Sequence, residues 1–233
     1  SPFLFALYVD DIIDKLKLLS YGCFVRFVNF NVLMYADDIL LIAPTVNALQ
    51  FLVTSCELTL KCLDMSINVK KSACMRIGKR ANVECSSITT GDGQTNETIG
   101  WHDSLKCMGI NFIRATCLKC CTRRAKGAFY RAFNAIFGKV GRCASEIVLA
   151  ELLVTKCLPI LLYAVEACPL NTSEINSLQF ALSSAIMKIF KTKSKEIVAV
   201  CAEQFGIPDI STSLKNRTDK FIDSFYSIHT VYR

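Results

Sequence analysis

Short apolar runs dominate the first half of the chain, and apolar residues at helical spacing dominate the second half. In the first half, two apolar runs at residues 32–36 and 39–43 flank the pair Asp37-Asp38. Runs of four or five residues rich in Val, Ile and Leu predict buried strands, and a polar pair between them predicts a tight turn. We therefore expect a β-hairpin with two carboxylates at its tip.

The segments around this hairpin show the residue spacings typical of helices and of strands. Apolar residues three and four apart predict helices over residues 2–19 and 46–64. Other segments predict a strand at 23–29, a mostly buried strand at 67–77, a loop or weak hairpin at 78–100, and a hairpin around 105–110. The sequence Tyr8-Val9-Asp10-Asp11 falls inside the first helix, so its carboxylates are expected on a helix flank near solvent.

The second half of the chain reads as a series of helices. We expect them at 119–140, 144–167, a third that begins at the capping sequence Asn171-Thr172-Ser173-Glu174, and two more at 195–205 and 211–228. Pro159 should kink or divide the second of these helices, because proline removes a backbone donor. The predicted fold class is α+β, with an antiparallel hairpin and helices followed by an α-helical part.

Basic residues are concentrated in the middle of the chain. The net charge of +7 divides into −3 for residues 1–60, +10 for residues 61–142 and zero for the rest. From Lys106 to Arg142 there are nine Lys and Arg and no Asp or Glu, with five Phe and Tyr residues among them. Such a segment suits a nucleic-acid backbone, although a solvated basic helix face is the simpler alternative. The candidates for phosphate contact are Arg123, Arg124, Lys126 and Arg131.

The adjacent carboxylates of Asp37 and Asp38 are the main candidates for chemistry. Neighbouring ionised carboxylates repel each other, so a rigid turn that holds two of them suits a divalent cation. Mg²⁺ is commonly held by one or two protein carboxylates together with substrate phosphates, which is the arrangement of phosphoryl transfer. The alternative is an ordinary solvated turn, because Asp is a favoured turn residue.

Three ordered motifs favour the catalytic interpretation. Tyr35-Ala36-Asp37-Asp38 resembles the Tyr-x-Asp-Asp box of reverse transcriptases, in the form usual in non-LTR (LINE-type) retrotransposons. Residues 1–8 upstream resemble the segment that follows this family's Gln-Gly loop, and Asn68, Lys71, Ser72 and Met75 downstream match its Asn-x-x-Lys-Ser/Thr-x-x-Met element. The chain therefore resembles part of a reverse transcriptase.

The resemblance implies a domain division and roles for individual residues. Residues 1–112 would be the second half of the polymerase palm, including a primer-grip-like hairpin, and residues 113–233 an α-helical thumb with C-terminal helices. Asp37 and Asp38 would be catalytic and would ligate Mg²⁺, with Mn²⁺ as the alternative ion, and Lys71 would serve near the leaving pyrophosphate. The residues expected at the substrate and primer are Tyr35, Met108 and Gly109.

The implied activity is RNA-directed DNA polymerisation, that is, addition of deoxynucleotides to a primer 3′ end by a two-metal mechanism. The partners would be an RNA template, a DNA primer, deoxynucleoside triphosphates and the N-terminal part of the same polyprotein, because the family's other catalytic Asp lies on an earlier strand. We expect the isolated chain to be inactive for that reason. The alternative is a catalytically dead retrotransposon remnant that binds nucleic acid at most.

Cysteine content and hydropathy bear on disulfides, zinc binding and membrane insertion. The chain has thirteen Cys, and without a visible secretion signal reduced thiols are expected. Cys117, Cys120 and Cys121 form a cluster with only half of a common zinc motif, so no zinc is expected. The longest uncharged run, residues 39–56, includes the second strand of the predicted hairpin, so it is not a membrane-spanning helix. No membrane partner is therefore expected. We expect an intracellular protein, in the nucleus or the cytoplasm.

Overall fold

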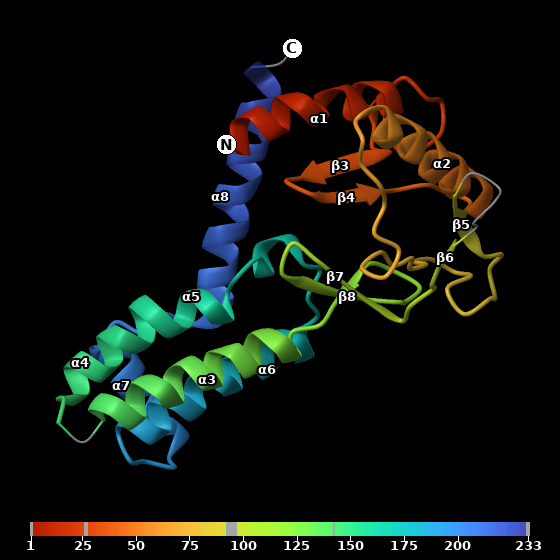
Figure 1. Ribbon diagram of the computed structural model, residues 1–233. Helices are drawn as coiled ribbons and strands as arrows, with labels where there is room; N and C mark the ends of the chain where they lie inside the picture. Colours follow the sequence, from red (N-terminus) through yellow and green to blue (C-terminus); the bar gives the residue numbers. More distant parts are fainter. Residues whose placement is uncertain (1, 26–27, 92–96, 142, 232–233) are drawn as a thin grey trace. The chain divides into compact units, whose positions relative to one another are not determined.

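The computed structural model describes residues 2–25, 28–91, 97–141 and 143–231. It has a mixed α+β fold, which confirms the predicted class (Figure 1). The chain forms two compact units. Unit 1 contains residues 1–105 and 114–116, and unit 2 contains residues 106–113 and 117–233.

Unit 1 is built around a hairpin packed against two helices. The hairpin strands are β3 (Val32–Tyr35) and β4 (Asp38–Leu41), and the helices are α1 (Pro2–Lys17) and α2 (Val46–Cys62) (Figure 1). The helices bury one face each, and the hairpin contributes Val32 to the same core. The buried members of this core are Val9, Ile12, Leu16, Val32, Leu52, Cys56 and Leu60.

Helix α2 begins where the sequence places a cap. Thr45 has extended backbone angles, and its hydroxyl accepts a hydrogen bond from the Ala48 amide at 3.1 Å. This bond satisfies one of the amides at the helix start that have no partner within the helix. The helix therefore starts directly after the hairpin, and its buried face continues the core that holds β3.

The segment predicted as one strand at residues 23–29 is instead two short strands, so that prediction was wrong. β1 (Phe24–Val25) pairs antiparallel with β2 (Val28–Asn29), and the positions between them lie outside the described residues. Phe24 and Val28 are more than half exposed, so the apolar character of this segment does not reflect core packing.

The predicted strand at residues 67–77 is also absent from the described residues. Asn68 accepts hydrogen bonds from Ser72 through its carbonyl, and both its carbonyl and its side-chain oxygen accept from the Lys71 amide. These local bonds form a turn that competes with strand pairing. Only Cys74 makes a β-bridge here, with Trp101.

Residues 78–113 supply two further hairpins. β5 (Ile88–Thr90) and β6 (Glu97–Ile99) form the weak hairpin that was predicted for the polar region. β7 (Ser104–Cys107), β8 (Ile110–Ile113) and β9 (Lys119–Cys120) form a three-stranded sheet in that order. The predicted hairpin around 105–110 is therefore confirmed, and β9 takes the first two residues of the segment predicted as helix 119–140.

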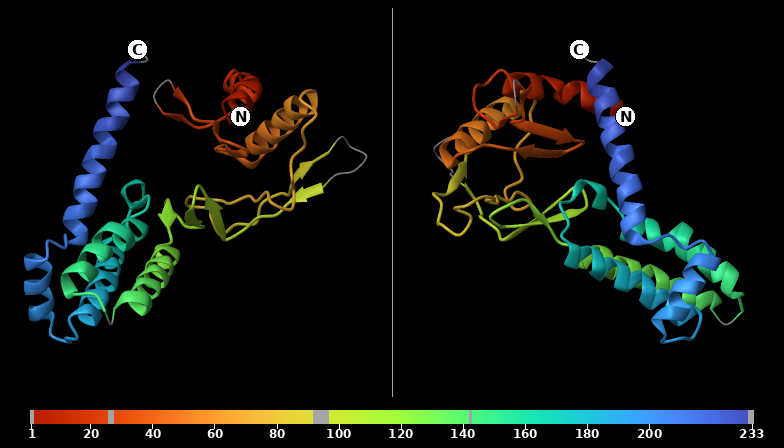
Figure 2. Two further views of the ribbon diagram at one scale, coloured as in Figure 1. Left: turned by 60° about the vertical axis from the view of Figure 1, so that its left-hand side comes forward. Right: turned by 180° about the vertical axis from the view of Figure 1, so that it is seen from behind.

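Unit 2 is a helical bundle with its own core. Its main helices are α3 (Arg123–Val140), α4 (Glu146–Leu152), α6 (Thr172–Ile189), α7 (Lys195–Gln204) and α8 (Ile210–Val231). Figure 2 shows α3 and α6 side by side. The predicted capping box is present, because the Asn171 side chain accepts from the Glu174 amide and the Glu174 side chain accepts from the Asn171 amide.

The helix that begins with α4 is not divided at Pro159; the backbone stays helical, and the expected irregularity takes the form of a π-helical turn just before this proline. The segment between α4 and α6 passes through this π-helical turn, η1 (Leu153–Cys157), then α5 (Leu158–Leu161) and a 3₁₀ turn, η2 (Val165–Ala167). The described residues include one stretch, Glu146–Ala167, that is long and apolar enough by composition to cross a membrane. Within this stretch, 39% of the apolar window is buried, and its buried side chains belong to the core of unit 2.

Candidate functional site

The Tyr35-Ala36-Asp37-Asp38 sequence forms the tip of the β3–β4 hairpin. Tyr35 pairs with Asp38, so Ala36 and Asp37 make a two-residue loop. Ala36 has a φ of 52°, a left-handed conformation of the kind that the first loop residue of some hairpin turns adopts. The tip carries both carboxylates in exposed positions, as the apolar runs on each side predicted.

Two buried features hold the base of this hairpin. Asn31, directly before β3, is fully buried, and its side-chain amide donates to the carbonyl oxygens of Leu16 and Tyr21. Its own carbonyl accepts from the Ile42 amide at 2.9 Å, just beyond β4. Asn31 therefore joins the end of α1, the following loop and both strands of the hairpin.

Gly22 makes this arrangement possible. Its φ is +148°, and a Cβ atom there would lie 2.5 Å from the Asn31 Cβ and would also collide with the Asn29 side-chain oxygen. Residues with side chains rarely adopt such a φ, and the space is already filled. The roles of Asn31 and Gly22 were not predicted from the sequence. The one signal at Asn31 is a polar residue between the apolar Phe30 and Val32.

The chemistry of the tip fits part of a divalent-metal site. Asp37 and Asp38 offer oxygen ligands, and both are accessible to solvent and to a substrate. Within the described parts of the chain, no group of three or more His, Cys, Asp or Glu residues is arranged to hold a metal ion. The pair suits an ion that takes its remaining ligands from water, substrate phosphates or another segment of protein.

The other predicted catalytic and primer residues lie on turns. Lys71 is exposed in the turn that follows Asn68, within unit 1, and Tyr35 is 68% exposed beside the carboxylates. Met108 and Gly109 form the two-residue loop between β7 and β8, and they belong to unit 2. The structure thus brings Tyr35, Asp37 and Asp38 together on one hairpin.

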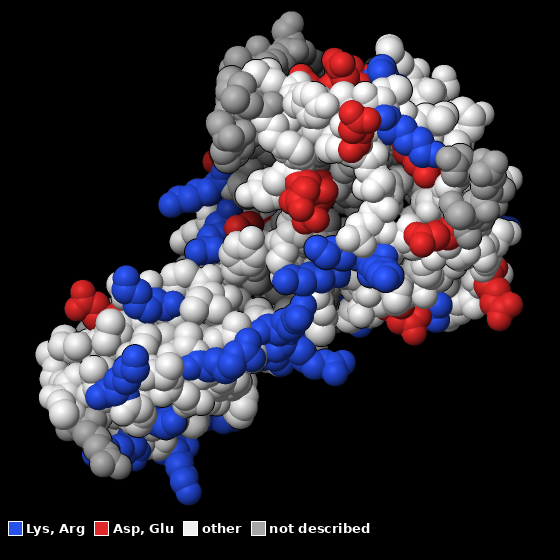
Figure 3. Space-filling model, viewed as in Figure 1, with Lys and Arg blue, Asp and Glu red and all other residues white. Residues whose placement is uncertain are grey.

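The predicted phosphate contacts lie on or near the first turns of α3. Arg123, Arg124 and Arg131 are exposed, whereas Phe129 and Phe133 on the same helix are buried in the core of unit 2. Lys126 is half-buried and its amino group donates to the Ser177 hydroxyl at 2.6 Å, so it also has a structural contact with α6. Figure 3 shows Lys and Arg gathered along the surface of this helical unit.

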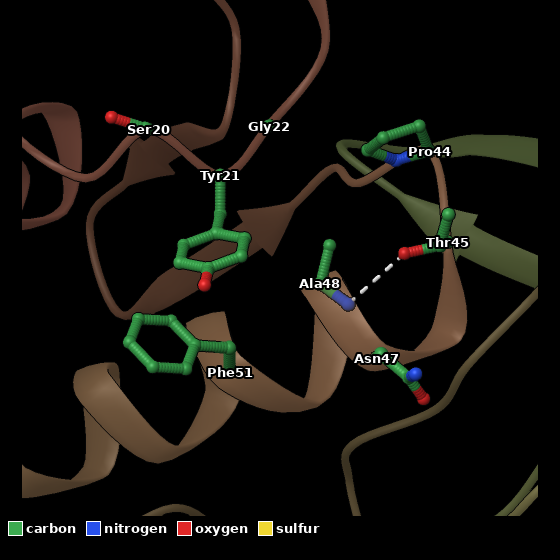
Figure 4. A pocket seen from close by; sticks show the side chains of 8 residues that line it. All are labelled: Ser20, Tyr21, Gly22, Pro44, Thr45, Asn47, Ala48 and Phe51. Carbon is green, nitrogen blue, oxygen red and sulfur yellow. Dashed lines mark hydrogen bonds between the residues drawn. The ribbon is translucent and has the colours of Figure 1, made fainter.

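A shallow hollow in unit 1 lies at the start of α2 (Figure 4). The rings of Tyr21 and Phe51 contact each other in its wall, with their centroids 4.3 Å apart and their planes tilted by 36°. The other lining side chains shown in Figure 4 are neutral, among them the capping Thr45. The hollow therefore brings no charged group to the chemistry of the hairpin.

Comparison with known proteins gives one match. Residues 1–112 match the family model described as "Reverse transcriptase (RNA-dependent DNA polymerase)", and this range contains the whole β3–β4 hairpin. Neither the curated proteins nor the solved structures give a match. The first 112 residues therefore carry a reverse transcriptase domain match, and residues 113–233 lie outside it.

Proposed function

We propose that this chain contributes the catalytic hairpin and a nucleic-acid-binding helical region to a reverse transcriptase of the non-LTR retrotransposon type. The observation that carries the proposal is the Tyr-Ala-Asp-Asp sequence on an exposed two-residue hairpin loop, inside the range matched by the reverse transcriptase model. The reaction is addition of deoxynucleotides to a primer 3′ end on an RNA template. The upstream part of the same polyprotein would supply the remaining catalytic carboxylate.

The residues of the hairpin have distinct proposed roles. Asp37 would hold a divalent ion, Mg²⁺ or Mn²⁺, with Asp38 assisting, and the bound ion would lower the barrier to attack by the primer hydroxyl and stabilise the leaving oxygen. Tyr35, with most of its ring exposed, would lie beside the primer end. Lys71 would place its positive charge near the departing pyrophosphate.

The proposed role of unit 2 is to hold the template–primer duplex. Its helix α3 separates two functions, because its aromatic face packs into the core and its Arg side chains face solvent. Exposed Arg groups can make bidentate contacts with phosphates, and these contacts carry no base specificity. Met108 and Gly109 would contact the primer strand.

A second candidate function is nucleic-acid binding without catalysis. The observation that favours it is that the described residues bring no third metal-ligating side chain to Asp37 and Asp38. A two-metal reaction needs carboxylates held in a defined arrangement, and one hairpin alone does not provide it. A retrotransposon remnant would then keep the basic surface and lose the chemistry.

Primer extension separates these two functions. The chain, joined to the segment encoded upstream of it, is tested for dNTP incorporation on an RNA template with a DNA primer. The double variant Asp37→Ala/Asp38→Ala should abolish incorporation. The matched control, Asp10→Ala/Asp11→Ala, changes the similar sequence on α1, where both carboxylates are exposed on the helix, and should stay within about twofold of the parent. Equal incorporation by the Asp37/Asp38 variant would reject the metal site.

Duplex binding tests unit 2 directly with the chain itself. The triple variant Arg123→Gln/Arg124→Gln/Arg131→Gln should reduce the slope of log affinity against log salt by about 2 to 3, because each lost phosphate contact removes nearly one released counterion. The control Lys215→Gln/Lys220→Gln changes exposed cations on α8. A slope that changes equally in both variants would refute a specific role for α3. Binding without incorporation would favour the remnant.

A further inference from the structure

The β7–β8 loop has a backbone conformation that needs outside support. Met108 has a φ of +48° and Gly109 a φ of +82°, so both loop residues are left-handed. Two positive φ values in a two-residue loop are typical of the tight hairpin turn that suits Asn-Gly or Gly-Gly. Met at the first position is unfavourable, because a side chain there crowds the backbone. Gly109 suits this conformation, whereas Met108 does not.

Tyr163 contacts both residues of this turn, and all three belong to unit 2. Its hydroxyl donates a hydrogen bond to the Met108 carbonyl oxygen at 3.4 Å. A Cβ atom built on Gly109 would lie 3.0 Å from the Cε1 atom of the Tyr163 ring, so only a glycine lets the ring come this close. The ring thus covers the peptide unit at the tip of the hairpin.

The backbone of Tyr163 is fixed by its neighbours. Leu161, Leu162 and Val165 are all buried in the core of unit 2, and Ala164 has a φ of +55° that turns the chain directly after Tyr163. The Tyr163 ring remains 61% exposed, so little of its surface is used for core packing. A rigid backbone with an outward ring is suited to support a neighbouring loop.

The base of the same hairpin is held separately. Phe112 and Ile113 of β8 pair with β9, the Asn111 carbonyl accepts from the Cys121 amide at 2.7 Å, and the Asn111 side chain accepts from Arg124 at 3.3 Å. These contacts fix the strands near α3 and do not reach the loop. Tyr163 provides a second attachment at the tip.

We infer that Tyr163 is a positioning residue for the Met108–Gly109 turn, which it holds in place so that the turn can contact the 3′-terminal part of a primer strand. The primer contact rests on the proposed function, whereas the support of the turn does not. The ring is accessible and the turn has an exposed Met side chain, so both can face a nucleic-acid strand.

Amide hydrogen exchange on the 233-residue chain, without nucleic acid, tests the support. Tyr163→Ala should speed exchange at residues 107–110 by about tenfold, while the amides in the middle of α6 keep their protection. Tyr163→Phe keeps the ring and should have a smaller effect. The matched control is Phe180→Ala, which removes a ring that is 65% exposed on α6 and should leave the turn unchanged. Unchanged exchange at the turn in Tyr163→Ala would overturn the inference.

Duplex binding tests the primer contact. The ligands are a labelled RNA–DNA duplex with a recessed DNA 3′ end and a duplex of equal length whose ends are closed by loops. The parent chain should prefer the recessed end, and Tyr163→Ala should lose that preference while keeping its affinity and salt slope on the closed duplex. Equal weakening on both ligands would contradict positioning. If the parent shows no preference although Tyr163→Ala still loosens the turn, the primer role in the proposed function fails and the support of the turn stands.

Discussion

Replacing Asn31 should destabilise the β3–β4 hairpin through its base. Asn31→Ala removes the side-chain donor to the Tyr21 carbonyl and one of two donors to the Leu16 carbonyl, which keeps its hydrogen bond from the Leu19 amide at 3.2 Å. Each lost hydrogen bond costs about 0.5–1.5 kcal/mol. The change also removes the Asn31 side-chain oxygen, which is buried without a hydrogen-bond partner, and this offsets about 1 kcal/mol. With the lost packing of this fully buried side chain included, we expect the free energy of unfolding of unit 1 to fall by about 1–2 kcal/mol.

The fluorescence of Trp101 makes the unfolding measurement specific to unit 1. It is the single tryptophan of the chain and it lies in unit 1, so urea unfolding followed by its fluorescence monitors that unit. The control is Asn47→Ala, an exposed Asn in the first turn of α2, for which a change below about 0.5 kcal/mol is expected. A loss below about 0.5 kcal/mol in Asn31→Ala as well would refute the hydrogen-bond reasoning.

Asn31→Asp tests the direction in which stability changes with pH. An ionised carboxylate would face two carbonyl oxygens with no donor, so this variant should be less stable than Asn31→Ala near neutral pH. Burial among acceptors favours the protonated carboxyl in the folded state, and the protonated form can donate one hydrogen bond. Stability should therefore recover as the pH falls toward about 4 and be lost as it rises. A stability difference between parent and variant that widens as the pH falls would contradict this account.

Three further predictions concern the two cores. Burial raises the pKa of the Cys56 thiol from 9.0 to about 11, so at pH 8 iodoacetamide should label exposed Cys62 and leave Cys56 unmodified in mass spectra of the folded protein. Asn171→Ala removes half of a capping box and should lower the stability of unit 2 by about 1 kcal/mol, measured by urea unfolding monitored by far-ultraviolet circular dichroism. Phe129→Ala empties a fully buried site and should cost about 3–5 kcal/mol in the same assay; a loss below about 1 kcal/mol would contradict the assigned core.

Helical segments were predicted well because their signals are local and periodic. Leu178, Leu182, Ile186 and Ile189 are all buried on α6 at the three- and four-residue spacing typical of a helix, and the cap at Asn171 fixed the start of the helix. The β3–β4 hairpin was also predicted, because two apolar runs with a polar pair between them fit few other structures. The predicted burial of its strands was wrong, since Val32 alone among their residues is buried.

The errors arose where local hydrogen bonds or exposure override an apolar pattern. The side chain of Asn68 organises a turn that no count of apolar residues reveals, so the strand predicted there does not form. Of the candidate site, the sequence predicted the exposed carboxylate tip but not its support. Asn31 and Tyr163 act through contacts with residues 15 and 55 positions away, and nothing in one sequence reports such pairs.

The π-helical turn before Pro159 indicates how tolerant this helix is to length changes. A π turn contains one residue more than an α turn, so deleting one residue from Leu153–Cys157 can restore ordinary α-helical spacing and keep both flanking apolar stripes facing inward. The same deletion in the middle of α6 would rotate everything after it by about 100° and expose Ile186 and Ile189. Length variation among related chains is thus expected to concentrate in the first of these two helices.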